Sequence, residues 1–166
     1  MEIRTAKIED LEKIVEIYNL SILAGYKTAD TNIFSVEQRS DWFYSHSPDK
    51  FPIYVAVEDD EIVGYSSLSA YREGRGAFSR TREVSFYIDS AYQGKNIGTE
   101  LLRHAINRCP ALDIKNLVAM LIEGNEASIS LLEKFGFQKW GHLPDIAEFD
   151  GKNTGQLYYG LQISNN

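Results

Sequence analysis

The loop QGKNIG, Gln93–Gly98, lies between the apolar run EVSFYID and the amphipathic run TELLRHAINRC. This order predicts a strand that ends and a helix that begins at the loop, where backbone N–H groups are free to bind a phosphate. No Gly-Lys-Ser/Thr of a Walker loop follows, and Lys95 between Gly94 and Asn96 departs from G-x-G-x-x-G. Nucleotide hydrolysis and dinucleotide binding are therefore disfavoured. An ordinary turn is the alternative interpretation.

A second segment in which a helix follows a strand lies downstream of the loop. Asn125–Phe137 reads NEASISLLEKFGF and follows the buried-strand pattern NLVAMLIE. Together the two segments resemble the cofactor-binding half of the Gcn5-related N-acetyltransferases (GNAT), whose pyrophosphate loop is R/Q-x-x-G-x-G/A. Gln93 and Gly98 match that loop, and Asn96 stands where the family usually has Gly. Because Asn tolerates positive φ, we expect the loop to form.

Four segments further upstream extend the resemblance: IYN, TADT, the R-x-x-W of Arg39–Trp42, and TREVSFYID. The set is similar to the phosphinothricin acetyltransferase-like branch of the family and covers Ile3 to Ile163. It implies an α/β GNAT fold, one domain over residues 1–166, with a mixed, mostly antiparallel sheet of about seven strands and about four helices. It also implies acetyl-CoA as co-substrate, a small, amino-acid-like primary amine as acceptor, and a homodimer.

Glu83 is the candidate catalytic base, since an ammonium group must lose a proton before it attacks a thioester. It matches the acidic residue of T-x-E-x-S-x-Y-V in this branch, and Ser85 and Tyr87 share its face of the predicted strand. Burial beside aromatic residues would raise its pKa toward a useful range. A strand-edge glutamate in water is the alternative.

The resemblance also implies a set of residues that bind the cofactor. The pantetheine arm pairs with the main chain of the strand before the loop, and N-x-x-S opens the following helix. Residues of this kind also occur in any buried strand, so the strand contacts follow from the resemblance alone. For the N-x-x-S pair, helix capping is the alternative role. The expected contacts are Phe86, Tyr87, Ile88, Gln93, Gly94, Lys95, Asn96, Ile97, Gly98, Thr99, Asn125 and Ser128.

Two departures from the branch concern its chemistry. Leu132 occupies the Tyr or His position of L-Y/H-E-K that protonates the departing thiolate, so Tyr87, Tyr92 or solvent must substitute. The G-x-W-x-D pattern near the C-terminus is absent, which disfavours phosphinothricin as substrate. A catalytically silent CoA-binding sensor and a protein or peptide N-acetyltransferase remain as alternative functions.

Four arginines lie between Tyr71 and Glu83. A solvated loop is one interpretation of this segment. The other is a substrate-facing loop in which Arg72 pairs with a carboxylate of the substrate.

Composition argues against nucleic-acid-binding, metal-binding and membrane proteins. The net charge of −7 argues against a nucleic-acid partner. A single cysteine, Cys109, and three scattered histidines offer no metal site. No apolar leader or membrane span is visible, so we expect a soluble, cytoplasmic protein without a membrane partner.

Hydrophobic periodicity predicts the order of the elements. Ser35 and Gln38 form a predicted capping box at the start of the second helix. The expected strands are 2–5, 51–57, 61–72, 81–89, 117–122, 137–142 and 155–163, and the expected helices are 11–22, 36–46, 98–108 and 125–135.

Overall fold

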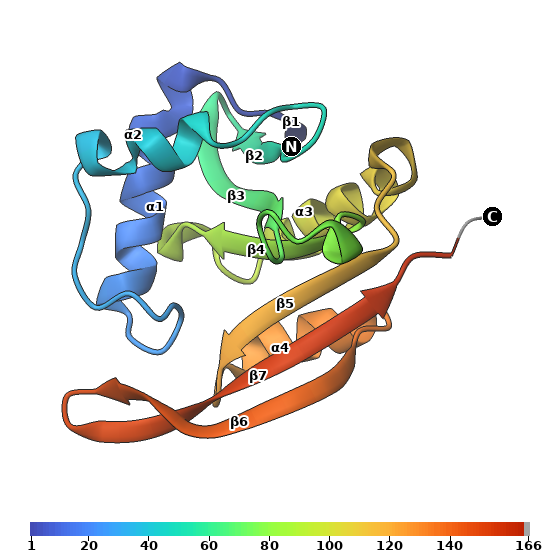
Figure 1. Cartoon of the computed structure of the whole chain (residues 1–166). Helices are drawn as coiled ribbons and strands as arrows, with labels where there is room; N and C mark the ends of the chain where they lie inside the picture. The colour runs from blue at the N-terminus through green and yellow to red at the C-terminus, as the bar shows by residue number, and fades with distance from the viewer. Residues whose placement is uncertain (165–166) are drawn as a thin grey trace.

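The structure is a computed structural model that describes residues 1–164. Within that range the chain forms seven strands and four α-helices in the predicted order (Figure 1). The elements are β1 (Glu2–Thr5), α1 (Leu11–Leu23), α2 (Val36–Tyr44), β2 (Ile53–Glu58), β3 (Glu61–Ala70), β4 (Thr81–Ile88), α3 (Ile97–Arg108), β5 (Asn116–Ile122), α4 (Glu126–Lys134), β6 (Gln138–Phe149) and β7 (Lys152–Gln162).

All seven strands belong to one sheet with the order β1-β2-β3-β4-β5-β7-β6. Only β4 and β5 are parallel, and every other neighbouring pair is antiparallel. The predicted mixed, mostly antiparallel sheet is therefore confirmed. The parallel pair is joined through α3, as a crossover connection requires.

The parallel pair separates soon after it begins. Thr81–Glu83 pairs with Asn116–Val118, and beyond these residues the two strands diverge (Figure 1). The second half of β4 consequently has a strand neighbour on the β3 side alone. This split in the sheet opens toward the beginnings of α3 and α4.

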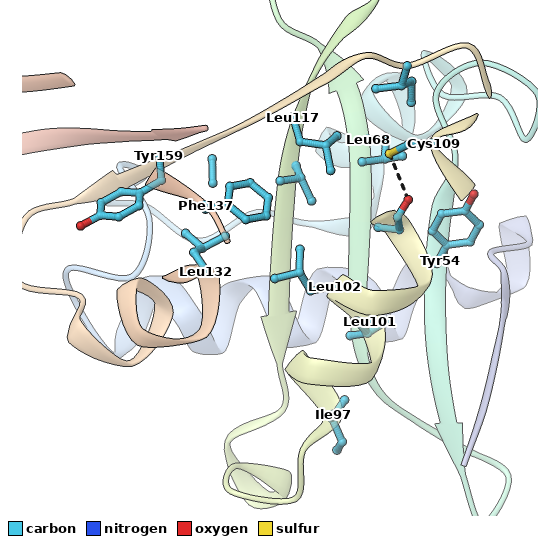
Figure 2. Close-up of a cluster of buried hydrophobic side chains, with 14 of the residues drawn as sticks. Tyr54, Leu68, Ile97, Leu101, Leu102, Cys109, Leu117, Leu132, Phe137 and Tyr159 are labelled. Atoms are coloured by element: carbon cyan, nitrogen blue, oxygen red, sulfur yellow. Dashed lines mark hydrogen bonds between the residues drawn. The ribbon is translucent and has the colours of Figure 1, made fainter. Parts of the chain in front are cut away.

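Two hydrophobic clusters cover the two faces of the sheet. Leu101 and Leu102 of α3 and Leu132 of α4 pack with Leu68 and Leu117 on one face (Figure 2). A second cluster joins α1 to the other face, where its members are Ile14, Ile17, Tyr18, Ile22, Ile53, Val55 and Tyr65. No helix within residues 1–164 is long and apolar enough to cross a bilayer.

Local sequence rules account for several element ends. Ser35 Oγ accepts from Gln38 N–H at 3.2 Å, and Gln38 Oε1 accepts from Ser35 N–H at 2.8 Å, which confirms the predicted capping box. At the end of α4, Gly136 has a φ of 84°. Its N–H bonds to Glu133 O, and Phe137 N–H bonds to Leu132 O, the two bonds of a Schellman cap.

The C-terminal hairpin is longer than the sequence analysis expected. Strands β6 and β7 run to Phe149 and from Lys152, joined by the two-residue turn Asp150–Gly151. Both turn residues have positive φ, 49° and 76°, as a type I′ hairpin requires. Pro144 masked the pattern, but β6 is an edge strand whose register shifts between Leu143 and Ala147, so a missing N–H is tolerated there.

Candidate active site

A pocket of about 400 Å³ lies at the split between β4 and β5. It brings together eleven of the twelve residues predicted to bind the cofactor: Phe86, Tyr87, Ile88, Gln93, Gly94, Asn96, Ile97, Gly98, Thr99, Asn125 and Ser128. Lys95 is the exception. Its ammonium nitrogen lies 4.5 Å from the centre of the Tyr92 ring, and its side chain does not line the pocket.

The loop before α3 has the backbone conformation that the sequence predicts. Asn96 has a φ of 62° and Gly94 a φ of 79°, and a Cβ on Gly94 would meet no atom within 4 Å. At Gly98 a Cβ would lie 3.1 Å from Leu131 Cδ2, so the glycine allows α3 to approach α4. Because the first N–H groups of a helix have no partner inside it, α3 offers donors to the pocket.

The register of β4 also directs main-chain groups toward the pocket. Asp89 N–H donates to Val63 O at 2.9 Å, and the two residues are opposite each other in the β3–β4 register. Since bonded pairs alternate in an antiparallel ladder, Tyr87 bonds to β3 while the N–H and C=O groups of Phe86 and Ile88 point into the split. A ligand in the split can therefore pair with β4 as a strand would.

Asn125 contacts a residue far away in the sequence. Its side chain is 5% exposed and makes no capping bond to α4, which argues against helix capping as its role. Its Oδ1 accepts a hydrogen bond from Lys27 Nζ at 3.4 Å. Lys27 follows α1 and lines the pocket too, so this contact spans the pocket from one wall to the other.

Glu83 is half-buried on the face of β4 that packs toward α1 and α2. Burial raises the pKa of its carboxyl group. Burial also raises the pKa of Tyr87 to about 12, and the nearby Glu83 carboxylate adds to that shift. Glu83 does not line the pocket itself, but Tyr87 does, so the two residues connect the pocket to the face on which Glu83 lies.

The two tyrosines considered as proton donors differ in their partners. Tyr92 lines the pocket, and its hydroxyl donates to Glu61 Oε2 at 3.1 Å. The Tyr87 ring packs between Tyr18 and Tyr65, with centroid distances of 5.0 and 5.3 Å. Leu132 is fully buried in the core, and its neighbour Leu131 lines the pocket instead.

The arginines between Tyr71 and Glu83 differ in their surroundings. Arg72 is exposed and does not line the pocket. Arg80 forms an ion pair with Asp113. Arg82 is 5% exposed, and its guanidinium donates to the carbonyl oxygens of Ser79 and Thr81 at 2.6 and 3.1 Å. Arg82 is thus a structural residue, which neither interpretation of the loop foresaw.

The structure brings together three upstream segments, IYN, TADT and the R-x-x-W of Arg39–Trp42, for whose residues the sequence indicated no role. The Tyr18 hydroxyl bonds to Thr28 Oγ1 at 2.8 Å and to the carboxylate of Asp30. The guanidinium of Arg39 lies 4.7 Å from the Tyr18 ring centre and 4.1 Å from that of Trp42. The pocket wall also includes Leu20, Ser21 and Ala24, in α1 and directly after it, which no sequence pattern indicated because they lie outside the apolar face of that helix.

The described part of the chain holds no cluster of three His, Cys, Asp or Glu side chains arranged to bind a metal ion. The donors gathered at the pocket are amides, hydroxyls and the ammonium group of Lys27. Such donors suit an anionic, hydrogen-bonding ligand.

Comparisons with known proteins agree with this geometry. Residues 11–137 match the model of the Acetyltransferase (GNAT) family. The Bacillus subtilis (strain 168) protein YwnH, provisionally named a phosphinothricin acetyltransferase, is 39% identical over 165 residues, covering 99% of this chain and 100% of its own. An L-methionine sulfoximine/L-methionine sulfone acetyltransferase of Pseudomonas aeruginosa (strain PAO1) is 35% identical over 164 residues, covering 97% of this chain and 94% of its own.

A solved structure shows the same fold. The crystal structure of a GNAT superfamily phosphinothricin acetyltransferase from Sinorhizobium meliloti in complex with acetyl-CoA superposes with a TM-score of 0.92 at 28% identity. The match covers 98% of this chain and 88% of that chain. The chain therefore belongs to the GNAT family and is an acetyl-CoA-dependent N-acetyltransferase.

Proposed function

We propose that the enzyme moves the acetyl group of acetyl-CoA to the primary amine of a small, amino-acid-like molecule by direct attack. The observation that carries this proposal is the pocket at the split between β4 and β5, whose wall joins the amides at the start of α3 to Tyr87, a residue on the same face of β4 as Glu83. One ligand can thus bind the loop with its phosphates and reach the base with its other end.

The pocket residues fit the co-substrate. The N–H groups from Gly94 to Gly98 suit a diphosphate, and the free main-chain groups of Phe86 and Ile88 suit the amides of a pantetheine arm. Asn125 and Ser128 line the opposite wall. When bound, acetyl-CoA supplies an activated acyl group and a thiol of pKa ~8.5 that departs readily.

Glu83 is the proposed general base. An amine of pKa ~10 is protonated at neutral pH and must lose a proton before it attacks. Burial raises the pKa of the Glu83 carboxyl group toward the range in which a carboxylate accepts a proton most usefully. A main-chain N–H of β4 that faces the split is our candidate to polarise the acyl carbonyl, an effect of about 3 kcal/mol in well-studied enzymes.

Tyr87 is the better candidate to protonate the departing thiolate. Both tyrosines line the pocket, and Tyr87, with a pKa of about 12, carries its proton at neutral pH. The Tyr92 hydroxyl is engaged with Glu61. The core position of Leu132 supports the view that α4 supplies no acid here.

Amino-acid-like acceptors are supported by a relative, because the Pseudomonas aeruginosa protein is named for two methionine derivatives. Arg72 is exposed near the end of β3, and we propose that it pairs with the carboxylate of such an acceptor. We also propose that the working form is a homodimer.

Thiol release is the direct test. Purified enzyme is mixed with acetyl-CoA and a panel of methionine sulfoximine, methionine sulfone, phosphinothricin, free amino acids and short peptides. Turnover of free amino acids or their analogues is expected. Faster turnover of peptides would contradict the small-molecule acceptor, and tight cofactor binding without turnover of any amine would favour a sensor.

The role of Glu83 is tested in the same assay with Glu83→Gln. We expect kcat to fall about 10² to 10⁴-fold, as for other general bases, while calorimetry shows unchanged acetyl-CoA binding. Glu12→Gln, at an exposed glutamate of α1, is the control and should behave as wild type. Full activity of Glu83→Gln would contradict the proposal that Glu83 is the general base.

A further inference from the structure

His46, just after the end of α2, has a role that the proposed mechanism does not use. The ring is half-buried, with its centroid 4.8 Å from that of Trp42. Its Nδ1 lies 2.7 Å from the carbonyl oxygen of Trp42, and its Nε2 lies 3.0 Å from Ser69 Oγ. Both ring nitrogens are therefore held in place, one by α2 and one by β3.

These two contacts fix the tautomer of the neutral ring. A carbonyl oxygen only accepts hydrogen bonds, so Nδ1 carries the hydrogen and Nε2 keeps its lone pair. Ser69 must then donate its hydroxyl hydrogen to Nε2. Burial lowers the pKa of His46, and the nearby Arg39 cation lowers it further, both of which favour the neutral ring.

Ser69 bonds to His46 and lies opposite the proposed base in the sheet. Ser69 and Glu83 are directly opposite each other in the β3–β4 register, which places their side chains on the same face of the sheet. The Cα atoms of such a bonded pair are about 5.5 Å apart, a distance that a glutamate side chain spans. Beyond Ser69, Glu83 on β4 is the titratable group on this path, and Arg39 is the charged group that faces His46 from α2.

We propose that His46, acting through Ser69, takes up the proton that Glu83 removes from the acceptor amine and passes it to solvent. The proposal rests on the proposed function, because it needs Glu83 as the base. His46 is a positioning residue in this scheme, since it touches neither substrate. The relay returns Glu83 to its carboxylate form during each turnover.

The protons balance in every step. An N–H bond of the ammonium breaks and an O–H bond forms on Glu83. That proton passes to Ser69 Oγ while Ser69 gives its own hydrogen to His46 Nε2, which leaves a carboxylate, a hydroxyl and an imidazolium. The imidazolium then releases one proton to water. Since burial raises the pKa of Glu83 and lowers that of His46, the driving force for the transfer becomes smaller, while the imidazolium releases its proton to water more readily.

The test uses His46→Asn, which keeps an N–H donor for the Trp42 carbonyl but has no base in place of Nε2. His104→Asn is the matched control, because His104 is also half-buried but packs on Tyr54, with ring centroids 4.5 Å apart. We expect kcat of His46→Asn to fall about tenfold or more, with the KM values for acetyl-CoA and amine unchanged. His104→Asn should keep both kcat and KM, and Ser69→Ala should resemble His46→Asn.

Two readouts separate a proton relay from a structural role. The first is His46→Ala, whose lost kcat should return as imidazole is added to the buffer, whereas an equal concentration of a non-basic salt should have no effect. The second is the double variant Glu83→Gln with His46→Asn, which should be no slower than Glu83→Gln alone, since both changes act on one proton path.

The outcomes distinguish the two proposals. If Glu83→Gln lowers kcat but His46→Asn is as fast as wild type, or if imidazole restores nothing, the relay is overturned and the base stands. Additive losses in the double variant also overturn the relay. If Glu83→Gln keeps full activity, both the relay and the proposed role of Glu83 fail.

Discussion

At the scale of single residues, the buried carboxyl group of Glu83 links function to stability. Burial raises its pKa in the folded state, so ionisation at neutral pH destabilises the fold. The stability associated with the protonated form is fully present below the unfolded pKa of ~4.3 and is lost as pH rises through the folded value. The proposed base is thus maintained at a cost to the folded state.

A pH series measures this cost. We predict that Glu83→Gln has a higher free energy of unfolding than wild type at pH 8, and that the difference shrinks to zero as pH falls below ~4.3, because glutamine does not ionise. Denaturant unfolding at several pH values provides the measurement. Glu12→Gln should show no such trend. A difference that stays constant with pH would contradict the assignment.

Residues governed by local rules were predictable from the sequence. Asn96 in the left-handed region, the Ser35–Gln38 capping box and the Gly136 cap all depend on neighbours within five positions, and all were confirmed. The contact of Lys27 with Asn125 joins residues 98 positions apart, and the burial of Arg82 depends on its neighbours in the folded structure. Such contacts depend on the folded sheet, so no local pattern indicated them.

At the scale of elements, α4 presents Leu132 to the core and Leu131 to the pocket. Replacing Leu132 by the tyrosine usual in this branch should therefore not add an acid to the site. We predict that Leu132→Tyr destabilises the protein by about 1 to 3 kcal/mol through overpacking and does not raise kcat. Chemical denaturation and thiol release measure the two quantities.

The control for that variant is Leu143→Tyr. Leu143 is 36% exposed on β6, so Leu143→Tyr should change the free energy of unfolding of the protein by less than about 0.5 kcal/mol. A Leu132→Tyr enzyme that is as stable as wild type and faster would show that α4 directs this side chain into the pocket after all.

The pairing of β6 with β7 depends on a close approach between Trp140 and Gly160. A Cβ on Gly160 would lie 1.9 Å from Trp140 Cε3. We predict that Gly160→Ala destabilises the protein by about 1 to 3 kcal/mol, because the indole must move. Gly76→Ala is the control, since a Cβ there meets nothing within 4 Å and the φ of Gly76 is not positive.

A double variant locates the cause of that destabilisation. Adding Trp140→Ala to Gly160→Ala removes the ring that the new methyl group meets, so the loss in the double variant should be smaller than the sum of the single losses. Strictly additive losses in the free energy of unfolding would show that the glycine serves the backbone of β7 and not the indole.

At the scale of the whole molecule, the aromatic segment LYYGL of β7 is consistent in sequence with either an interface or a packed sheet. Leu157 and Tyr159 are 4% and 5% exposed, which supports the packed sheet, and β7 lies between β5 and β6. On the neighbouring strand β6, by contrast, the apolar side chains of Trp140 and Ile146 are 47% and 56% exposed. Because β6 is the last strand of the sheet, it also carries the unpaired backbone groups of an edge.

We therefore expect the proposed dimer to form through β6. Sedimentation of the wild type should give twice the mass of one chain, and Ile146→Glu should give one chain, because it places a charge in the apolar contact. Since each chain carries a net charge of −7, repulsion between copies should make the dimer stronger as salt is added. Ile33→Glu, at a residue 58% exposed in the loop before α2, should stay dimeric. A wild type that sediments as one chain at every salt concentration would contradict the dimer, and an Ile146→Glu variant that remains dimeric would place the interface away from β6.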